Sequence, residues 1–173
     1  MKNLFIPILG GLLCVSFTPK PITETNRHSD PVAAANAAIV SSLYHSIQLD
    51  QYGLPEKAFF AAWKGYQKLL DQKRISRCDY LTICDFSQSS RQKRLYIIDV
   101  ANSKLLIHTY VAHGRNSGAE YANRFSNKPE SLQSSLGFYI TSNTYLGEHG
   151  LSLRINGIEP AYNDKALERS IVI

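Results

Sequence analysis

The sequence predicts an α+β fold, in which a pair of helices precedes a β-rich region. Apolar residues recur at helical spacing between residues 30 and 72, and the pattern changes to β-rich runs from Tyr80 onward. Apolar residues make up 44% of the 173-residue chain, which contains ten Tyr, seven Phe and one Trp. This composition can fill the core of one domain, and it excludes general disorder and collagen-like or coiled-coil architectures.

The first 18 residues predict a secretory signal peptide. Lys2 precedes an apolar run from Leu4 to Val15, which is short for a bilayer span, since a spanning helix needs about 20 apolar residues. Two alternatives stay open: lipidation at Cys14, although the bulky Leu13 precedes it, and a short buried helix. Residues 19–29 are rich in Pro, Thr and polar side chains and predict a linker. We therefore expect the protein to be exported.

Residues 30–76 predict an N-terminal helical unit. Asp30 can cap the free amides of a first helix, Pro31 suits its first turn, and Gly53 and Pro55 are expected to end it. A second helix is expected from about residue 55 to residue 72. Each helix has an apolar face, formed by Ala35, Ile39, Leu43 and Ile47 in the first and by Phe59, Ala62, Trp63, Tyr66 and Leu70 in the second. We expect both faces to pack against the region that follows.

Residues 77–173 predict the β-rich part of the fold. Runs of apolar and β-branched residues predict five strands, over 81–86, 94–100, 105–112, 137–141 and 150–155. The second and third runs flank the short polar segment 101–104 and therefore predict a hairpin. At most a short helical turn is expected over 164–169.

The 23 residues from His113 to Ser135 predict a packed loop or lid at a cleft. Loops longer than about 12–15 residues are usually functional or disordered, and this one contains Tyr121 and Phe125. His113-Gly114 and His149-Gly150 each place an imidazole at a strand end, where it can exchange a proton near neutral pH. The alternative for each histidine is a structural role, with the ring hydrogen-bonded to a nearby carbonyl.

Charge and metal-ligand types argue against two function classes. The net charge of +5 is scattered along the chain, so nucleic-acid binding is not predicted, whereas contact with an anionic envelope polymer is compatible with it. His108, His113, Glu148 and His149 are residue types that bind metals. However, His108 and His113 are an odd number of steps apart on one predicted strand and would face opposite sides, so no metal site is predicted.

Two further predictions concern the pairing of the cysteines and the apolar run at the C-terminus. Cys78 and Cys84 would lie about 20 Å apart on one strand, so they can form a disulfide only if the chain folds back; otherwise they are small buried apolar residues. The apolar run 170–173 predicts either an edge strand that reaches solvent or a truncated chain. We favour truncation, because a terminal carboxylate on a buried strand is costly.

Several motifs, in order and spacing, resemble those of one family. They are Asp85-Phe86-Ser87, 95–99, Val111-Ala112-His113-Gly114, Phe125-Ser126-Asn127, 134–139, Tyr145-x-Gly147-x-His149-Gly150-x-Ser152-Leu153, Gly157-x-Glu159, Asn163-Asp164 and Arg169-x-Ile171-Val172-Ile173. From about residue 36 to its end, the chain resembles the murein L,D-transpeptidase catalytic-domain family of the YkuD-like clan.

The resemblance implies a sandwich-like or barrel-like core and cysteine-dependent acyl transfer on peptidoglycan, without a metal or organic cofactor. A thiolate attacks the diamino-acid carbonyl of a stem peptide, expels the terminal D-alanine and passes the acyl group to an amine or to water. The resemblance also implies a location in the periplasm or cell envelope, with membrane contact only through the export signal. The positions that it suggests for substrate binding are His113, Gly114, Ser135, Tyr145, His149 and Gly150.

The sequence departs from the family pattern after residue 170. In the family, the strand that matches 170–173 runs into a catalytic His-Gly, and a Gly-Cys-Pro motif follows; the printed residues stop before either motif is reached. We therefore expect a partial catalytic domain over 77–173 that is inactive as given. Two other functions remain open: a non-catalytic peptidoglycan-binding module that uses Arg115, Arg124 and Lys128, and a zinc-dependent peptidase.

Overall fold

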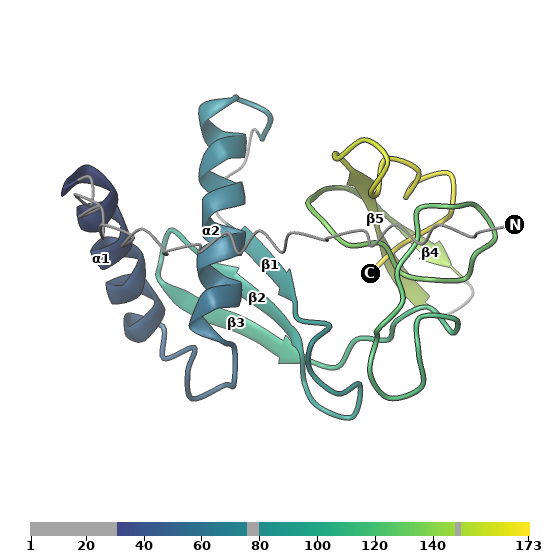
Figure 1. The fold of residues 1–173 in the computed structure, drawn as a ribbon, viewed down its shortest axis with the longest axis horizontal. Coiled ribbons are helices and arrows are strands. Elements are labelled where there is room, and N and C mark those ends of the chain that lie inside the picture. Colours follow the sequence, from purple (N-terminus) through teal and green to yellow (C-terminus); the bar gives the residue numbers. More distant parts are fainter. Residues whose placement is uncertain (1–30, 76–79, 148–149) are drawn as a thin grey trace, which may run out of the picture.

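The computed structural model describes residues 31–75, 80–147 and 150–173. Two helices precede five strands along the chain (Figure 1). Their bounds are α1 (Pro31–Ser46), α2 (Glu56–Asp71), β1 (Tyr80–Cys84), β2 (Leu95–Asp99), β3 (Lys104–Thr109), β4 (Tyr139–Gly147) and β5 (Gly150–Gly157). The predicted signal peptide and linker, 1–18 and 19–29, lie outside the described residues, as does Cys78. In the described part of the chain, neither helix has the length and apolar character that a membrane span requires.

Helix α2 forms where the sequence predicts it, whereas α1 ends earlier than expected. The prediction that Gly53 and Pro55 end the first helix is wrong, because α1 already ends at Ser46. Gln48 adopts the left-handed conformation with φ of 61°, and the amide of Leu49 donates to the carbonyl of Tyr44 at 3.2 Å. This geometry closes the helix and turns the chain toward α2.

The apolar face of α1 is also shifted from its predicted position. Ala35 and Ile39 were expected in the core but are exposed, and Ile39 is 65% exposed. Val40 and Tyr44 are buried instead, so α1 packs through its C-terminal half. Only those turns of α1 that lie against α2 and the first sheet are buried.

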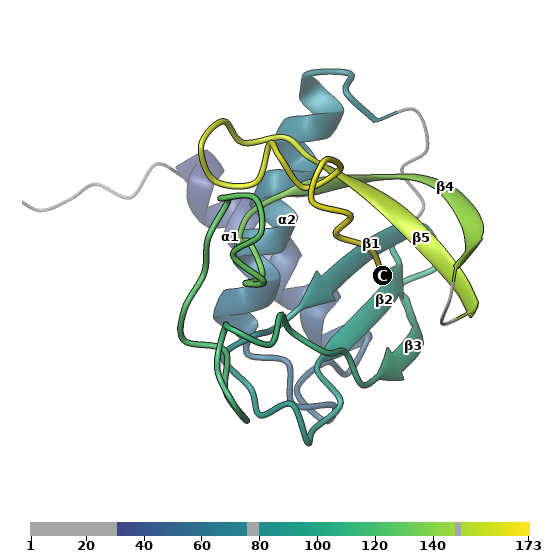
Figure 2. The same cartoon turned by 90° about the vertical axis from the view of Figure 1, so that its right-hand side faces the viewer.

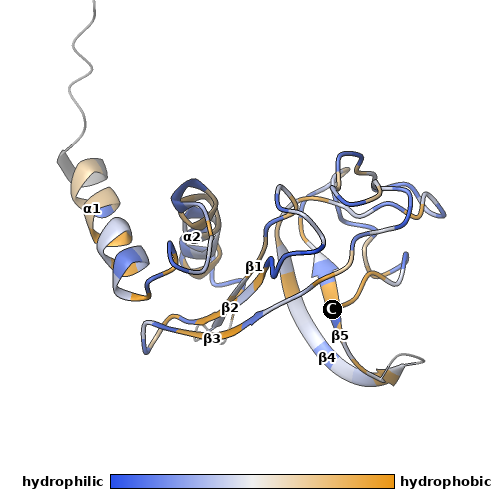
Figure 3. Cartoon of the chain, turned by 90° about the horizontal axis from the view of Figure 1, so that it is seen from below, coloured by the Kyte–Doolittle hydropathy of each residue, from blue (hydrophilic) through white to orange (hydrophobic). Residues whose placement is uncertain are grey.

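The first sheet is antiparallel with strand order β1-β2-β3, which confirms the predicted hairpin. Asp99 stabilises the hairpin turn, because its carboxylate accepts hydrogen bonds from the amide and the side chain of Asn102. Both helices lie on one face of this sheet (Figure 3). The buried core between them is formed by Val40, Tyr44, Ile47, Leu49, Leu54, Phe59, Ile83, Tyr96 and Ile98.

The second sheet is the antiparallel hairpin β4–β5. Strand β4 is longer than the predicted run 137–141 and has an irregular register between Thr141 and Thr144. Residues 160–170 form consecutive turns. The predicted strand over 170–173 is reduced to one bridge, between Arg154 and Val172, with Ile173 exchanging two backbone hydrogen bonds with Leu153 at 2.7 and 3.0 Å.

The two sheets lie side by side (Figure 1), and in Figure 2 the hairpin β4–β5 lies in front of the first sheet. They are joined by the long segment 110–138, in which the structure assigns no helix or strand. Two helices and two small antiparallel sheets confirm the mixed α+β class. The described strands do not close into a single barrel.

Candidate functional site

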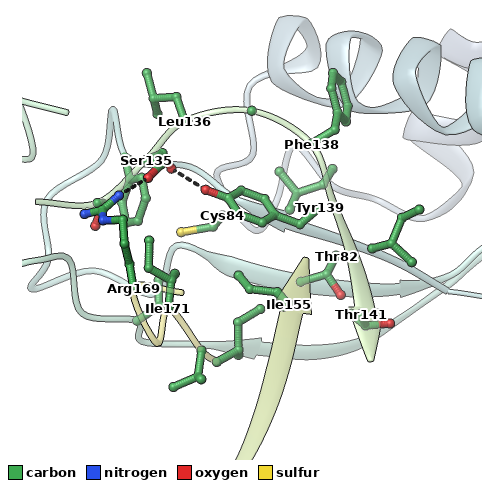
Figure 4. Close-up of a pocket in the computed structure, with 18 of the residues that line it drawn as sticks. Thr82, Cys84, Ser135, Leu136, Phe138, Tyr139, Thr141, Ile155, Arg169 and Ile171 are labelled. Atoms are coloured by element: carbon green, nitrogen blue, oxygen red, sulfur yellow. Dashed lines mark hydrogen bonds between the residues drawn. The ribbon is translucent and has the colours of Figure 1, made fainter. Parts of the chain in front are cut away.

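A cleft of about 1540 Å³ lies between the two sheets (Figure 4). Its walls come from α2, β1, β4, β5, the segment 129–137 and the C-terminal residues 168–173. The floor is mostly apolar, with Leu81, Ile83, Leu95, Phe138, Ile140, Ile155 and Ile171 among its residues. Small-molecule pockets usually measure about 300–1,000 Å³, so this cleft is large enough for a polymeric ligand.

Two local features of the sequence shape the cleft. Strand β1 is an edge strand, and all five of its residues line the cleft. Gly65 on α2 allows the ring of Phe138 to lie directly against the helix, since a side chain at this position would overlap the ring. The start of β4 is thereby held against α2, which closes one end of the cleft.

A second set of contacts holds the start of β4 from the opposite side. The amide of Phe138 donates to Glu159 Oε2 at 2.7 Å, and Asn163 Nδ2 donates to the carbonyl of Phe138 at 2.9 Å. The amide of Glu159 in turn donates to Asn163 Oδ1 at 2.9 Å. Gly137 has φ of 119°, and a side chain there would meet the Glu159 carboxylate. Asn163, which is fully buried, therefore joins the turn segment to β4.

Arg169 forms the polar end of the cleft. Its guanidinium donates to the carbonyl of Ser126 and to Ser135 Oγ, both at 2.6 Å, and to Ser131 Oγ at 3.0 Å. The hydroxyl of Tyr139 donates to the carbonyl of Ser135 at 2.9 Å, and burial raises the pKa of this tyrosine. These groups present fixed hydrogen-bonding partners beside an apolar floor.

Cys84 places a free thiol in the cleft wall (Figure 4). Burial raises the pKa of this thiol to about 12, against a smaller opposing effect of Arg94. Within the described residues, no hydrogen bond joins Cys84 to a histidine. The thiol is therefore protonated at neutral pH and lacks the base that a nucleophilic cysteine requires.

His113 lies behind the cleft rather than in its lining. Arg94, which is fully buried, approaches His113 Nδ1 at 2.7 Å through its guanidinium, and His113 Nε2 lies 3.2 Å from the carbonyl of Gly118. Because a guanidinium can only donate, Nδ1 accepts this hydrogen bond and Nε2 donates to the carbonyl. Both ring nitrogens are thus occupied by the protein itself.

The other predicted substrate-binding residues are dispersed. Gly114 and Ser135 both line the cleft, and the amide of Gly114 donates to the neighbouring Ser134 Oγ at 3.0 Å. Tyr145 lies on β4 beneath Arg154, whose guanidinium carbon is 4.2 Å from the ring centroid. Gly150 begins β5 and is exposed, and His149 lies outside the described residues. The substrate-binding role of all six positions remains a prediction.

Sequence reasoning did not single out Arg169 and Asn163 as site residues. Arg169 reaches acceptors 34 to 43 positions earlier in the chain, and Asn163 reaches an acceptor 25 positions earlier. A local sequence pattern does not predict contacts between residues so far apart in the chain. The sequence pointed to these two residues only in that both belong to motifs of the family resemblance.

The candidate metal ligands are not gathered in the described part of the chain. No group of three or more His, Cys, Asp or Glu side chains is placed there to hold a metal ion. His108 instead stacks on Tyr96, with ring centroids 4.6 Å apart, and its Nε2 lies 2.8 Å from the carbonyl of Lys93. Glu148, like His149, lies outside the described residues.

One known family matches this chain. The model of the L,D-transpeptidase catalytic domain matches residues 50–173, a range that includes α2 and every wall of the cleft. Neither a curated protein nor a solved structure matches it. On the family match over most of its length, the chain belongs to the L,D-transpeptidase catalytic-domain family.

Proposed function

We propose that this chain is the scaffold of an exported peptidoglycan L,D-transpeptidase, located in the periplasm or cell envelope. The parent enzyme transfers the acyl group of a murein stem peptide through a cysteine thioester. The observation that carries this proposal is the family match over 50–173, and the large cleft supports it because a stem peptide is an extended polymer segment. The export signal assigned to residues 1–18 is part of the proposal.

The chemistry requires a thiolate, an imidazole within hydrogen-bonding distance of it, and backbone amides that face the oxyanion. Among the described residues, Cys84 is held as a thiol and His113 is bound to Arg94 and Gly118. We therefore propose that the 173 residues as printed are inactive. The family resemblance assigns these roles to a His-Gly motif and a Gly-Cys-Pro motif that follow the strand matching 170–173.

The proposal is tested by incubating the purified chain with muropeptides and following them by mass spectrometry. We expect neither release of D-alanine nor new cross-links. Release of D-alanine that is lost in the Cys84→Ala variant would overturn the assignment of inactivity. The DNA downstream of codon 173 provides a second test, since a reading frame that continues through His-Gly to Gly-Cys-Pro supports the parent enzyme.

A second candidate function is a non-catalytic peptidoglycan-binding module. Arg115, Arg124 and Lys128 are all exposed on the segment 110–138, and no side-chain hydrogen bond or ion pair ties them to the described part of the chain. Free cations of this kind suit an anionic polymer.

Sedimentation with insoluble peptidoglycan tests this second function. The triple variant R115A/R124A/K128A should lose most of the binding. The matched control K57A/K64A/K68A removes the same charge from the exposed face of α2 and should retain it. Equal binding by both variants would contradict a role of these three side chains.

A further inference from the structure

We propose that Arg169 is a positioning residue, which clamps the segment 126–135, called here the cleft loop, to the C-terminal residues 166–173. Through this clamp it sets both the shape of the cleft mouth and the direction of Ile171–Ile173. The inference rests on the proposed function in one respect. The shape of the cleft affects activity only if the stem peptide binds in the cleft.

The guanidinium of Arg169 connects positions that are distributed along the whole cleft loop. One terminal nitrogen donates to the carbonyl of Ser126 and to Ser135 Oγ, at the two ends of the loop. The other terminal nitrogen donates to Ser131 Oγ and to the carbonyl of Gln133, in its middle. A single planar group thus holds four acceptors, which only the fork geometry of arginine can reach together.

The partners of Arg169 are neutral. Its four acceptors are backbone carbonyls and serine hydroxyls, and no ion pair to it occurs in the part of the chain that the structure describes. The contact therefore depends on the positions of several donors rather than on charge neutralisation. Because the side chain is only half-buried, its charge is kept partly solvated.

The same residue determines where the following segment goes. Ser170 has φ of 54°, a left-handed conformation that turns the chain directly after Arg169. The amide of Ile171 donates back to the carbonyl of Ala166 at 2.9 Å, and Ile173 then pairs with Leu153 on β5. Because this turn is adjacent to Arg169, releasing the guanidinium frees the turn and the three residues that follow.

The cleft loop is held independently on its other side. The amide of Ser134 donates to Ser117 Oγ at 2.8 Å, and the amide of Asn116 donates to the carbonyl of Leu132 at 3.0 Å. Ser117 is fully buried and makes no contact with Arg169 through its hydroxyl. Ser117→Ala is therefore a matched control, which loosens the same loop without touching the C-terminal segment.

Hydrogen exchange on the full chain tests the inference without any need for activity. In Arg169→Gln, we expect amide exchange to accelerate about tenfold in both 126–135 and 166–173, because several charge-assisted hydrogen bonds are lost. Arg169→Lys should behave similarly, since one ammonium group cannot reach four dispersed acceptors. Ser117→Ala should accelerate exchange around 114–117 and 131–134 and leave 166–173 unchanged.

Alkylation of Cys84 reports on the shape of the cleft in the same variants. With Cys14 and Cys78 replaced by Ser, Cys84 is the only remaining thiol, and it lines the cleft that Arg169 borders. We expect alkylation to be about fivefold faster in Arg169→Gln than in the parent background, because the loop opens.

Three results would overturn the inference. They are unchanged exchange in Arg169→Gln, acceleration in only one of the two segments, and full recovery of protection in Arg169→Lys, which would assign the effect to charge alone. Exchange in β2 monitors global unfolding. If β2 also loses protection, Ser131→Ala decides instead, since it removes a single acceptor and should still accelerate both segments by about threefold. None of these outcomes depends on peptidoglycan, so the proposed function can fail separately.

Discussion

The helix–sheet region, formed by α1, α2 and β1–β3, and the hairpin region, residues 110–173, are stabilised by different forces. Eleven of the thirteen apolar side chains that are buried in the described residues belong to the helix–sheet region, and the other two are Ile155 and Ala166. The hairpin region is instead held by polar side chains, chiefly Ser117, Asn163 and Arg169.

The difference explains where the cleft is found. In the helix–sheet region, α1 and α2 cover one face of the first sheet and bury the apolar side chains on that face. In the hairpin region, Leu146 and Leu151 pair across the strands at 85% and 72% exposure, and many apolar side chains of both regions line the cleft. Hydrogen bonds to fixed partners hold this region in place while leaving its apolar surface available to a ligand.

The largest predicted effect is in the helix–sheet region. Leu49→Ala should lower the free energy of unfolding by about 2–5 kcal/mol, because Leu49 is fully buried in the core and its truncation leaves a cavity. Urea denaturation measures the change. The matched substitution Leu151→Ala in the hairpin region should cost less than about 0.5 kcal/mol. Similar costs at the two leucines would contradict the division between the regions.

A smaller effect is expected in the hairpin region. Asn163→Ala should cost about 1–3 kcal/mol, because it leaves the amide of Glu159 without its acceptor and removes one of the two donors to the carbonyl of Phe138, the other being the amide of Ile158. Hydrogen exchange should accelerate in β4 and remain slow in β2. Asn143→Ala is the control, since this exposed side chain accepts a single side-chain hydrogen bond within the described part of the chain, from Ser142, and its loss should be neutral. Acceleration in β2 would show that the two regions unfold together.

The third effect concerns Cys84, which lies where the two regions meet, and it is confined to alkaline pH. Burial raises the pKa of this thiol from 9.0 to about 12, so the folded state keeps the proton while the unfolded state releases it as the pH rises through 9. The contribution of Cys84 to stability is therefore fully present below pH 9 and is lost progressively between pH 9 and pH 12.

Thermal melting of the wild type and of Cys84→Ala measures this contribution. Other titrating groups cancel in the comparison, so the difference in Tm should shrink as the pH is raised from 8 to 11. A constant difference over this interval would show that the thiol is solvated and that the cleft wall is open to water at β1.

Prediction from the sequence succeeded where structure depends on neighbouring residues. Helix α2 and the β2–β3 hairpin follow from local periodicity and from a short polar turn, and both are confirmed. The apolar face of α1 was misplaced, because the residues that are covered depend on how far α2 and the sheet extend along α1. Ile39 has the correct spacing for the core and still lies in solvent.

The candidate site divides in the same way. The length of the segment 113–135 and the strand end at His113-Gly114 predicted a cleft, and Gly114 and Ser135, the latter suggested only by the family resemblance, line one. The hydrogen bonds of Arg169 and Asn163 that hold the cleft walls could not be predicted, because these side chains bind backbone carbonyls 25 to 43 positions away in the sequence.

By itself, the sequence determined the α+β class, the order of most elements and the family, because these depend on periodicity, on turn residues and on motif spacing. Only the tertiary structure decided which side chains of α1 are buried, which residues hold the cleft loop, and that Cys84 is a protonated thiol without a histidine partner among the described residues. Burial and hydrogen bonding between distant segments arise only when the chain is folded, because they depend on distances in space that sequence separation does not report.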